Sequence, residues 1–363
     1  MALEPRPSPE RVRLVVLFGG RSAEHEVSCI SALHVMRAID PQRYEVAAVG
    51  ITRDGRWVAA EGLGSLPPGA LALPSPEETT GTSLSPGEVG GLGSGDLPVV
   101  VFPVLHGPMG EDGTVQGMLE LAGLPYVGAG VLASALCMDK AMCKQLLAAG
   151  GLPVVRSVVL NRSEVEGTGA ESAVGQLGYP VFVKPSNMGS SVGVSRVSGP
   201  GELEAAVALA LRYDDWVLAE EAVQGREIEV AVIGNEAPRA SVPGEIRPSR
   251  EFYDFEDKYL DGSPDLVVPA PLDEGAVEEV RRLAVDAYRL LRVEGMARVD
   301  FFYEEHGRGF IVNELNTIPG FTPGSMYPML WSASGLPYPA LIDELVRLAL
   351  ERHRRRQEHR TER

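Results

Sequence analysis

The chain has 363 residues, which is too long for one ordinary domain and suits two or three domains with separate cores. It has 50 acidic and 33 basic residues, and the formal net charge of −17 argues against general binding to nucleic acid or to an anionic membrane. We therefore expect small molecules as partners, with no nucleic acid and no membrane.

The cysteines and the N-terminal residues indicate a cytoplasmic protein. Cys29, Cys137 and Cys143 are an odd set without CxxC spacing, so we expect buried thiols in a reducing compartment rather than disulfides or a zinc site. Early prolines stand where a signal peptide needs an apolar core, and no apolar run approaches the ~18 residues of a membrane span.

The first part of the chain has the pattern of a parallel α/β domain. Residues 12–20 form an apolar run that ends in two glycines, and residues 22–39 have the spacing of a helix. Residues 44–51 and 96–107 are further apolar runs, which are typical of strands buried on both faces of a parallel sheet. Residues 61–97 are rich in Gly, Ser, Pro and Leu without a period, and they predict a flexible excursion outside the packed layers.

The next motif, residues 179–197, is a glycine- and serine-rich loop between two strands. Lys184 ends the first strand and residues 189–193 form the loop. A P-loop or a dinucleotide fingerprint needs a strand, a glycine loop and then a helix, so this context excludes both. Backbone N–H groups of such a loop can hold an anion while Lys184 adds charge, and an ordinary tight turn is the alternative.

Acidic and aromatic residues are frequent in the two segments that follow. Glu220, Glu221, Glu227 and Glu229 surround a glycine turn, and their carboxylates suit ribose hydroxyls or, as the alternative, a solvated rim. Residues 251–263 mix tyrosine and lysine with acidic residues and predict an active-site loop rather than a helix.

The strongest chemical signal is a predicted hairpin of two strands rich in aromatic and β-branched residues. Strand alternation places Arg298 and Asp300 on one face, and pairing puts Asp300 opposite Glu314 and Arg298 opposite Asn316. Carboxylate and amide oxygens suit a divalent cation such as Mg²⁺ that is shared with phosphate oxygens. The alternative is a solvated edge with a surface ion pair.

Together these motifs make the chain similar to the D-alanine–D-alanine ligases of the ATP-grasp superfamily, from Val12 to about Leu350. The resemblance is carried, in order, by GGRSAEHEVS, LHGPMGEDGTVQGMLELAGLPYVGAG, SALCMDK, VKPSNMGSSVGVS, FYDFEDKYL, ARVDFF and NELNTIPGFTPGSMYP. It implies an α/β and α+β multidomain protein, in which an N-terminal parallel α/β domain precedes a two-part ATP-grasp fold that holds ATP. We expect an N-terminal domain at residues 1–130, a central lid domain at 131–220, a C-terminal catalytic domain at 221–350, and a polar, solvated tail at 351–363.

The resemblance also implies a reaction. The γ-phosphoryl group of ATP passes to the carboxylate of a first D-alanine, and the amine of a second D-alanine then attacks the acyl phosphate. The product, D-alanyl-D-alanine, is a peptidoglycan precursor. Phosphoryl transfer needs positioning and charge neutralisation more than a protein nucleophile, so no catalytic Ser or Cys is required.

The family pattern implies roles for residues of this chain. Glu24 would hold the ammonium of the first D-alanine, and the hydroxyls of Ser190 and Tyr259 would close the loop with it. Arg298 and the Gly320 N–H would donate to the tetrahedral oxyanion. These five residues have the catalytic roles. ATP-binding roles fall to Lys140, Lys184, Ser191, Glu220, Glu227 and Lys258. Magnesium, or manganese, would be held by Asp300, Glu314 and Asn316. Ser325 and Met326 match positions near the second D-alanine, and His106 matches a substrate-binding segment in which a structural hydrogen bond is an equal alternative.

Other functions fit parts of this pattern. A ligase that joins D-alanine to D-lactate or D-serine is the near alternative, although Lys258-Tyr259 matches the dipeptide-forming relatives. An ATP-binding regulatory module without catalysis is an alternative of another class, and the retention of every predicted metal ligand argues against it. The resemblance further implies a homodimer formed through N-terminal surfaces, and it leaves activation by a monovalent cation open.

Overall fold

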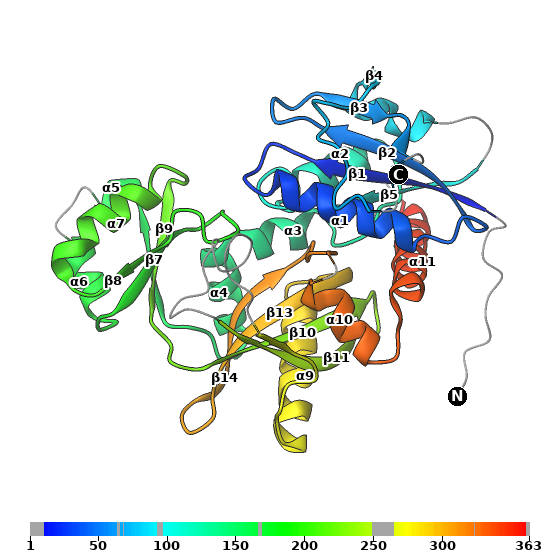
Figure 1. Cartoon of the computed structure of the whole chain (residues 1–363). Coiled ribbons are helices and arrows are strands. Elements are labelled where there is room, and N and C mark those ends of the chain that lie inside the picture. The colour runs from blue at the N-terminus through cyan, green and yellow to red at the C-terminus, as the bar shows by residue number, and fades with distance from the viewer. Residues whose placement is uncertain are drawn as a thin grey trace.

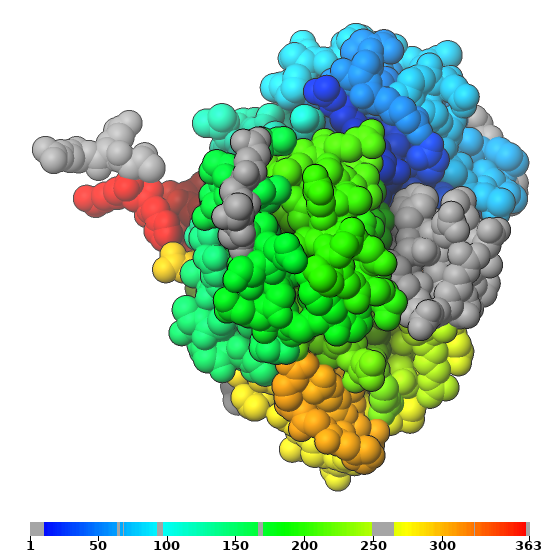
Figure 2. Space-filling view, turned by 90° about the vertical axis from the view of Figure 1, so that its left-hand side faces the viewer, coloured from blue at the N-terminus to red at the C-terminus, as the bar shows by residue number. Residues whose placement is uncertain are grey.

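The computed structural model describes residues 11–63, 66–67, 69–92, 97–165, 169–248, 265–322 and 324–360. Within them, the chain forms three β-sheets with helices packed on them (Figure 1). In Figure 2 the central sheet unit, in green, faces the viewer between the N-terminal part above and the orange β-hairpin turn of the C-terminal sheet below.

The N-terminal sheet has parallel strands at its centre, as predicted. Its elements are β1 (Val12–Gly19), α1 (His25–Ala38), β2 (Tyr44–Ile51), β3 (Trp57–Ala60), β4 (Gly81–Leu84), the 3₁₀ helix η2 (Pro86–Gly91), β5 (Val99–Pro103) and α2 (Thr114–Leu121). The strand order is β4-β3-β2-β1-β5, and β1 is parallel to both β2 and β5. Every residue of β1 is buried, which accounts for its largely apolar sequence, and the charge of its buried Arg13 is paired with Glu45 on β2.

The prediction that residues 61–97 lie outside the packed layers is wrong. Strand β4 pairs antiparallel with β3 and so extends the N-terminal sheet. Leu63, Leu73 and Val89 are buried in the apolar cores on either side of this sheet. A four-residue strand and isolated leucines and valines have no period, so composition alone could not show that this segment packs.

The central sheet is antiparallel, with the strand order β6-β9-β7-β8. Helices α3 and α4 lead into it, and a core of small and branched apolar residues lies between its strands and its own helices. The elements are α3 (Val131–Met138), α4 (Lys140–Ala149), β6 (Ser157–Asn161), α5 (Arg162–Val165), α6 (Gly169–Gly175), β7 (Val181–Pro185), β8 (Ser195–Val197), η3 (Pro200–Glu202), α7 (Leu203–Ala210) and β9 (Trp216–Glu221).

The C-terminal sheet is antiparallel, with the order β12-β11-β10-β13-β14, and has a helix on each face. Its elements are β10 (Arg226–Gly234), β11 (Arg239–Arg247), β12 (Asp265–Val267), α9 (Glu274–Leu290), β13 (Gly295–Glu304), β14 (Gly309–Asn316) and α10 (Met326–Ala333). Alternation along β10 divides its apolar residues between the two helices. Val230 and Val232 face the core under α9, whereas Ala231 and Ile233 share a core with α10.

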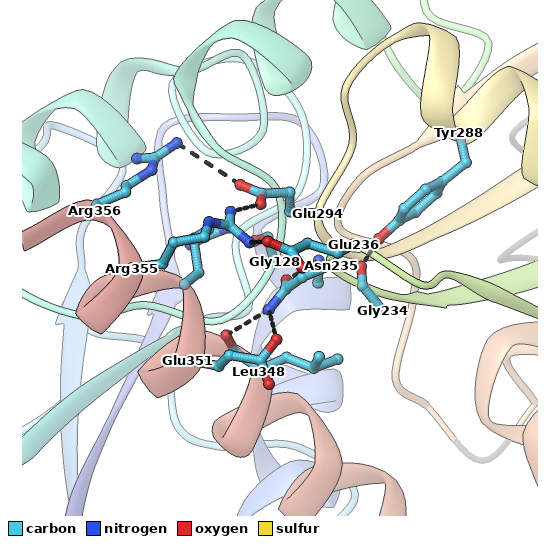
Figure 3. Close-up of polar contacts among 12 residues, drawn as sticks. Gly128, Gly234, Asn235, Glu236, Tyr288, Glu294, Leu348, Glu351, Arg355 and Arg356 are labelled. Atoms are coloured by element: carbon cyan, nitrogen blue, oxygen red, sulfur yellow. Dashed lines mark hydrogen bonds and ion pairs between the residues drawn. The ribbon is translucent and has the colours of Figure 1, made fainter. Parts of the chain in front are cut away.

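Helix α11 (Tyr338–Gln357) joins the C-terminal sheet to the N-terminal part of the chain. Figure 3 shows Asn235 donating to the Leu348 carbonyl at 3.1 Å and Arg355 paired with Glu294. One turn before the end of α11, Arg352 is 3% exposed and donates to the carbonyls of Gly128 and Tyr126.

The predicted solvated tail from residue 351 onward is therefore wrong for the part of α11 that reaches Gln357. Arg352, Arg355 and Arg356 have partners that lie far away in the sequence, and a local pattern cannot show such partners. Among the helices in the described part of the chain, none combines the length and the apolar content needed to cross a bilayer.

Candidate active site

A cavity of about 1020 Å³ lies between the three sheets. Its walls come from the start of α1, from the loop between β7 and β8, from β10, β13 and β14, and from residues 317–320, 322 and 324–326. The predicted site residues in the described part of the chain all line it: Glu24, His106, Lys140, Lys184, Ser190, Ser191, Glu220, Glu227, Arg298, Asp300, Glu314, Asn316, Gly320, Ser325 and Met326. The remaining two, Lys258 and Tyr259, fall outside the described residues.

The hairpin β13–β14 has the predicted register. Arg298 is opposite Asn316 and Asp300 is opposite Glu314. The guanidinium of Arg298 donates to both oxygens of Asp300, each at 2.7 Å, and lies 3.0 Å from Glu229 on β10. Burial alone would lower the pKa of Arg298, but these carboxylates raise it well above its usual range. The result is a fixed cation in the cavity wall.

The oxygen ligands that a divalent cation prefers are close together on this face. The side-chain amide of Asn316 donates to Asp300 at 2.9 Å, and Glu314 lies 3.8 Å from Lys140. In the residues that the structure describes, no three His, Cys, Asp or Glu side chains gather as a complete metal site. The donor set of two carboxylates and one amide therefore fits a cation that takes its remaining ligands from phosphate and water.

A buried ion triad lies beside the hairpin. Glu220 on β9 contacts Lys144 on α4 at 3.0 Å and Lys184 on β7 at 2.6 Å. Burial raises the pKa of Glu220, but the two lysines outweigh it and hold this pKa below its usual value. Lys144 also donates to the carbonyl of Asn313 on β14, so the triad connects the central sheet to the C-terminal sheet.

The solvated-rim alternative for the acidic cluster is wrong for three of its four members. Glu220, Glu221 and Glu229 are all buried. Arg156 and Arg308 pair with Glu221, so its charge is compensated by residues far away in the sequence. Buried carboxylates need such partners, and alternation along one strand cannot reveal them.

The Gly–Ser loop, residues 186–194, lies over the cavity. Ser190 and Ser191 have φ angles of 48° and 57°, in the left-handed region that non-glycine residues seldom adopt. The Ser190 hydroxyl donates to Glu24 at the start of α1. Lys140 Nζ donates to the carbonyl of Met188 at 2.5 Å, so the loop is held from both the N-terminal and the central parts of the chain.

Besides Glu24, the N-terminal part of the chain contributes His106 and a second carboxylate, Glu111, to the cavity wall. His106 is buried, its Nδ1 lies 3.1 Å from the Ile318 carbonyl, and its Nε2 lies 3.4 Å from Ser31. A carbonyl only accepts, so Nδ1 carries the proton. Burial lowers the pKa of His106, which keeps it neutral. These contacts favour the structural alternative for this histidine.

Sequence reasoning missed two charged residues of the site. Glu111 lines the cavity, and burial followed by the charge of Glu24 raises its pKa to about 8. Lys144 is on the buried stripe of α4 between Ala141 and Leu147, and a lysine at that spacing was a signal available in the sequence. No comparable local pattern singles out Glu111.

The remaining wall is formed by Gly320, Thr322, Gly324, Ser325 and Met326. The Ser325 hydroxyl accepts from the Thr322 N–H at 3.0 Å and is 2.8 Å from the Thr322 hydroxyl. A side chain at Gly320 would meet Ser325 Oγ at 2.6 Å, so glycine keeps its backbone accessible. Met326 begins α10 and contacts Gly244 of the C-terminal sheet.

The fold and the site define a class of enzyme. A glycine-rich loop and Lys184 of one antiparallel sheet, together with Lys140 of the helix that leads into it, face carboxylates of a second antiparallel sheet across a single cavity. This arrangement is the ATP-grasp fold.

Comparison with known proteins identifies the family within that class. The family models for the D-ala D-ala ligase N-terminus and C-terminus match residues 13–129 and 146–347. The chain is 48% identical over 351 residues to a D-alanine–D-alanine ligase of Thermoanaerobacter sp. (strain X514), covering 95% of this chain and 98% of that relative. It is 49% identical over 373 residues to one of Mycolicibacterium smegmatis, covering 96% and 98%.

Solved structures agree with this result. The D-alanine–D-alanine ligase from Coxiella burnetii has a TM-score of 0.82 at 37% identity, covering 96% of this chain and 97% of that one. A D-Ala:D-Ser ligase from Enterococcus faecalis has a TM-score of 0.79 at 35% identity, covering 93% and 99%. The chain belongs to the D-alanine–D-alanine ligase family.

Proposed function

We propose that the protein joins two D-alanine molecules to D-alanyl-D-alanine at the expense of ATP, through a D-alanyl phosphate, and so supplies peptidoglycan precursor synthesis. One observation carries this proposal: the Gly–Ser loop, the lysines, the hairpin carboxylates and Glu24 all line one cavity. This set can bind a nucleotide triphosphate and a zwitterionic amino acid side by side.

The phosphate end of ATP is assigned to the two cavity lysines and the Gly–Ser loop. Lys140 and Lys184 line the cavity and would supply positive charge, while Ser191 and the loop N–H groups would supply donors. Glu220 and Glu227 are assigned to the ribose and adenine end, and Lys258 to the γ-phosphate. In this assignment the buried triad also directs Lys184, because Glu220 fixes its ammonium at 2.6 Å.

The divalent cation is assigned to Asp300, Glu314 and Asn316, and we propose Mg²⁺, with Mn²⁺ as a substitute. When bound, it would neutralise charge on the transferring phosphoryl group. Arg298 would remain paired with Asp300 at 2.7 Å and so keep that carboxylate correctly oriented.

The amino-acid end is assigned to Glu24. Its carboxylate would hold the first D-alanine ammonium, and Ser190, which donates to Glu24, would close the loop over it with Tyr259. The carboxylate of this D-alanine takes the γ-phosphoryl group, and ADP leaves. The second amine, after losing a proton, attacks the acyl carbon. Arg298 and the Gly320 N–H would stabilise the oxyanion, and phosphate then leaves. Ser325 and Met326 are assigned to the carboxylate of the second D-alanine. His106 is assigned to the segment beside the first D-alanine.

The test is phosphate release from ATP with Mg²⁺ and D-alanine, L-alanine, D-serine or D-lactate, with products identified by mass. We expect turnover with D-alanine that yields the dipeptide, and none with L-alanine. Binding of ATP without turnover on any of these compounds would support the non-catalytic module instead.

A second substrate other than D-alanine is the nearest competing function. The similarity to a D-Ala:D-Ser ligase at 35% identity motivates testing D-serine as the second substrate. Competition between D-alanine and D-serine, and between D-alanine and D-lactate across pH, separates the three products. A dominant mixed product would replace the proposed dipeptide.

We also propose a cytoplasmic homodimer with the domain limits 1–130, 131–220 and 221–350. The three cysteines are free and buried, and burial raises the pKa of Cys29 and Cys143 to about 12, so these thiols suit a reducing compartment. Leu121 on α2 is 94% exposed and Leu132 on α3 is 53% exposed, which supports pairing through this surface. A Leu121→Glu variant that remains dimeric in analytical ultracentrifugation would exclude this surface.

A further inference from the structure

One short turn, residues 213–214, contacts both stems of the Gly–Ser loop, and Asp139 also accepts from Ser186 and Asn187 at the first stem. Asp214 accepts hydrogen bonds from Asn187, through the backbone N–H at 2.8 Å and the side-chain amide at 2.9 Å. Its other oxygen accepts from the Trp216 N–H at 3.2 Å. The first stem of the loop is thereby fixed to the start of β9.

Tyr213, the residue before Asp214, contacts the second stem of the loop. Gly193 has a φ of +74°, and a side chain there would meet the Tyr213 ring at 2.7 Å and Pro185 at 3.0 Å. The Tyr213 ring therefore lies directly against the end of the loop. Consecutive residues of one turn, Tyr213 and Asp214, contact the two ends of the same loop.

The tip of the loop has few contacts of its own. Within it, Val192 donates to the Gly189 carbonyl at 3.1 Å and Val194 donates to the Ser191 carbonyl at 3.3 Å. Ser190 and Ser191 both have positive φ. Because so little holds the tip from inside, the position of Ser191 depends on how the stems are fixed, whereas Ser190 also has its own hydrogen bond to Glu24.

We propose that Asp214 is a positioning residue for the ligase reaction, which fixes the start of the Gly–Ser loop through Asn187 and so places Ser191 and the loop N–H groups over the nucleotide. It touches neither substrate. The inference rests on the proposed function for its kinetic readout and extends it to a residue outside the cavity wall.

The adjacent Asp215 provides a matched control. It has the same charge, and its side chain is 78% exposed and pairs with Arg162 at 3.0 Å, away from the loop. Asp214→Ala removes the acceptor for two hydrogen bonds of Asn187, whereas Asp215→Ala makes the same change in charge without touching the loop.

The experiment compares steady-state kinetics of the whole protein and its variants. Misplacing a binding group by about 1 Å costs on the order of 100-fold in rate, so we expect Asp214→Ala to lower kcat/KM for ATP about 10- to 100-fold. We expect Asp215→Ala to match the wild type and Asp214→Asn, which keeps an acceptor for the Asn187 N–H, to recover most of the loss. The KM for the first D-alanine should change less than the KM for ATP.

Two results would overturn the inference: Asp214→Ala kinetics within about twofold of Asp215→Ala, or no recovery in a folded Asp214→Asn protein. If Asp214→Ala does not fold, Asn187→Ala decides, because it removes the side-chain bond to Asp214 and must then raise the KM for ATP while Asp214→Asn stays near the wild type. If the wild type shows no D-alanine-dependent turnover, the proposed function fails separately. Calorimetric binding of a non-hydrolysable ATP analogue then still tests whether Asp214→Ala weakens nucleotide binding relative to Asp215→Ala.

Discussion

The hairpin β13–β14 and the Gly–Ser loop face each other across the same cavity, and they hold their functional groups in different ways. On the hairpin, strand register places Arg298, Asp300, Glu314 and Asn316 on one face, and short ion pairs and hydrogen bonds then lock them. The loop has little internal support and takes its shape from distant residues. The comparison teaches that one wall of the site is encoded locally and the other by long-range contacts.

Removing one cation of the buried ion triad beside the hairpin has the largest expected effect. Lys144→Met leaves Glu220 with one of its two cations in a buried setting, where removing a partner costs about 3–5 kcal/mol of unfolding free energy. Chemical denaturation measures this loss. The exposed pair Arg162–Asp215 is the control, since Arg162→Met should cost at most about 1 kcal/mol. Equal losses in the two variants would contradict the buried role of Lys144.

A smaller change within the same wall separates charge from geometry. Arg298→Lys keeps the cation but loses the two parallel bonds to Asp300. We expect kcat to fall by about 10²–10³-fold, the usual effect of losing an oxyanion donor, with a smaller effect on nucleotide affinity. Single-turnover kinetics would show it. An unchanged kcat would remove Arg298 from the chemistry.

On the loop, Ser190→Ala removes the hydroxyl that donates to Glu24. A hydrogen bond to a charged group contributes about 1.5–3 kcal/mol, so we expect a rise of about 10- to 100-fold in KM for the first D-alanine. Ser190→Gly removes the same hydroxyl but also relieves the positive φ of 48°. If the two variants behave alike, the hydroxyl matters more than the backbone strain.

Glu111 lines the cavity that the hairpin and the Gly–Ser loop share. We expect its substitution to change how the free energy of unfolding depends on pH. Its pKa of about 8 in the folded protein is raised from an ordinary 4.5, so the folded state keeps a proton that the unfolded state loses. Its contribution to stability is therefore full below about pH 4.5 and falls as the pH rises toward about 8. Glu111→Gln should flatten this slope in metal-free protein followed by thermal denaturation. If the slope of stability against pH is unchanged in Glu111→Gln, Glu111 is not the group with the raised pKa.

The sequence predicted what local rules control. Alternation and a glycine turn were enough for the hairpin register, and a largely apolar run was enough for the buried parallel strand β1. The acidic cluster and the arginines of α11 were mispredicted because their partners are far away, as Glu221 and Arg308 show. Asp214 escaped notice for the same reason, since nothing near it in the sequence points to Asn187.

Arg352 has a consequence for how the protein is made. Its guanidinium satisfies the carbonyls of Tyr126 and Gly128, which lie 226 and 224 residues earlier. On the ribosome, the N-terminal sheet can form early. The carbonyls of Tyr126 and Gly128, however, lack the Arg352 donor until α11 has been synthesised. A nascent chain, or a fragment truncated before α11, would expose an apolar surface that α11 otherwise covers. Such chains are natural clients for chaperones and proteases.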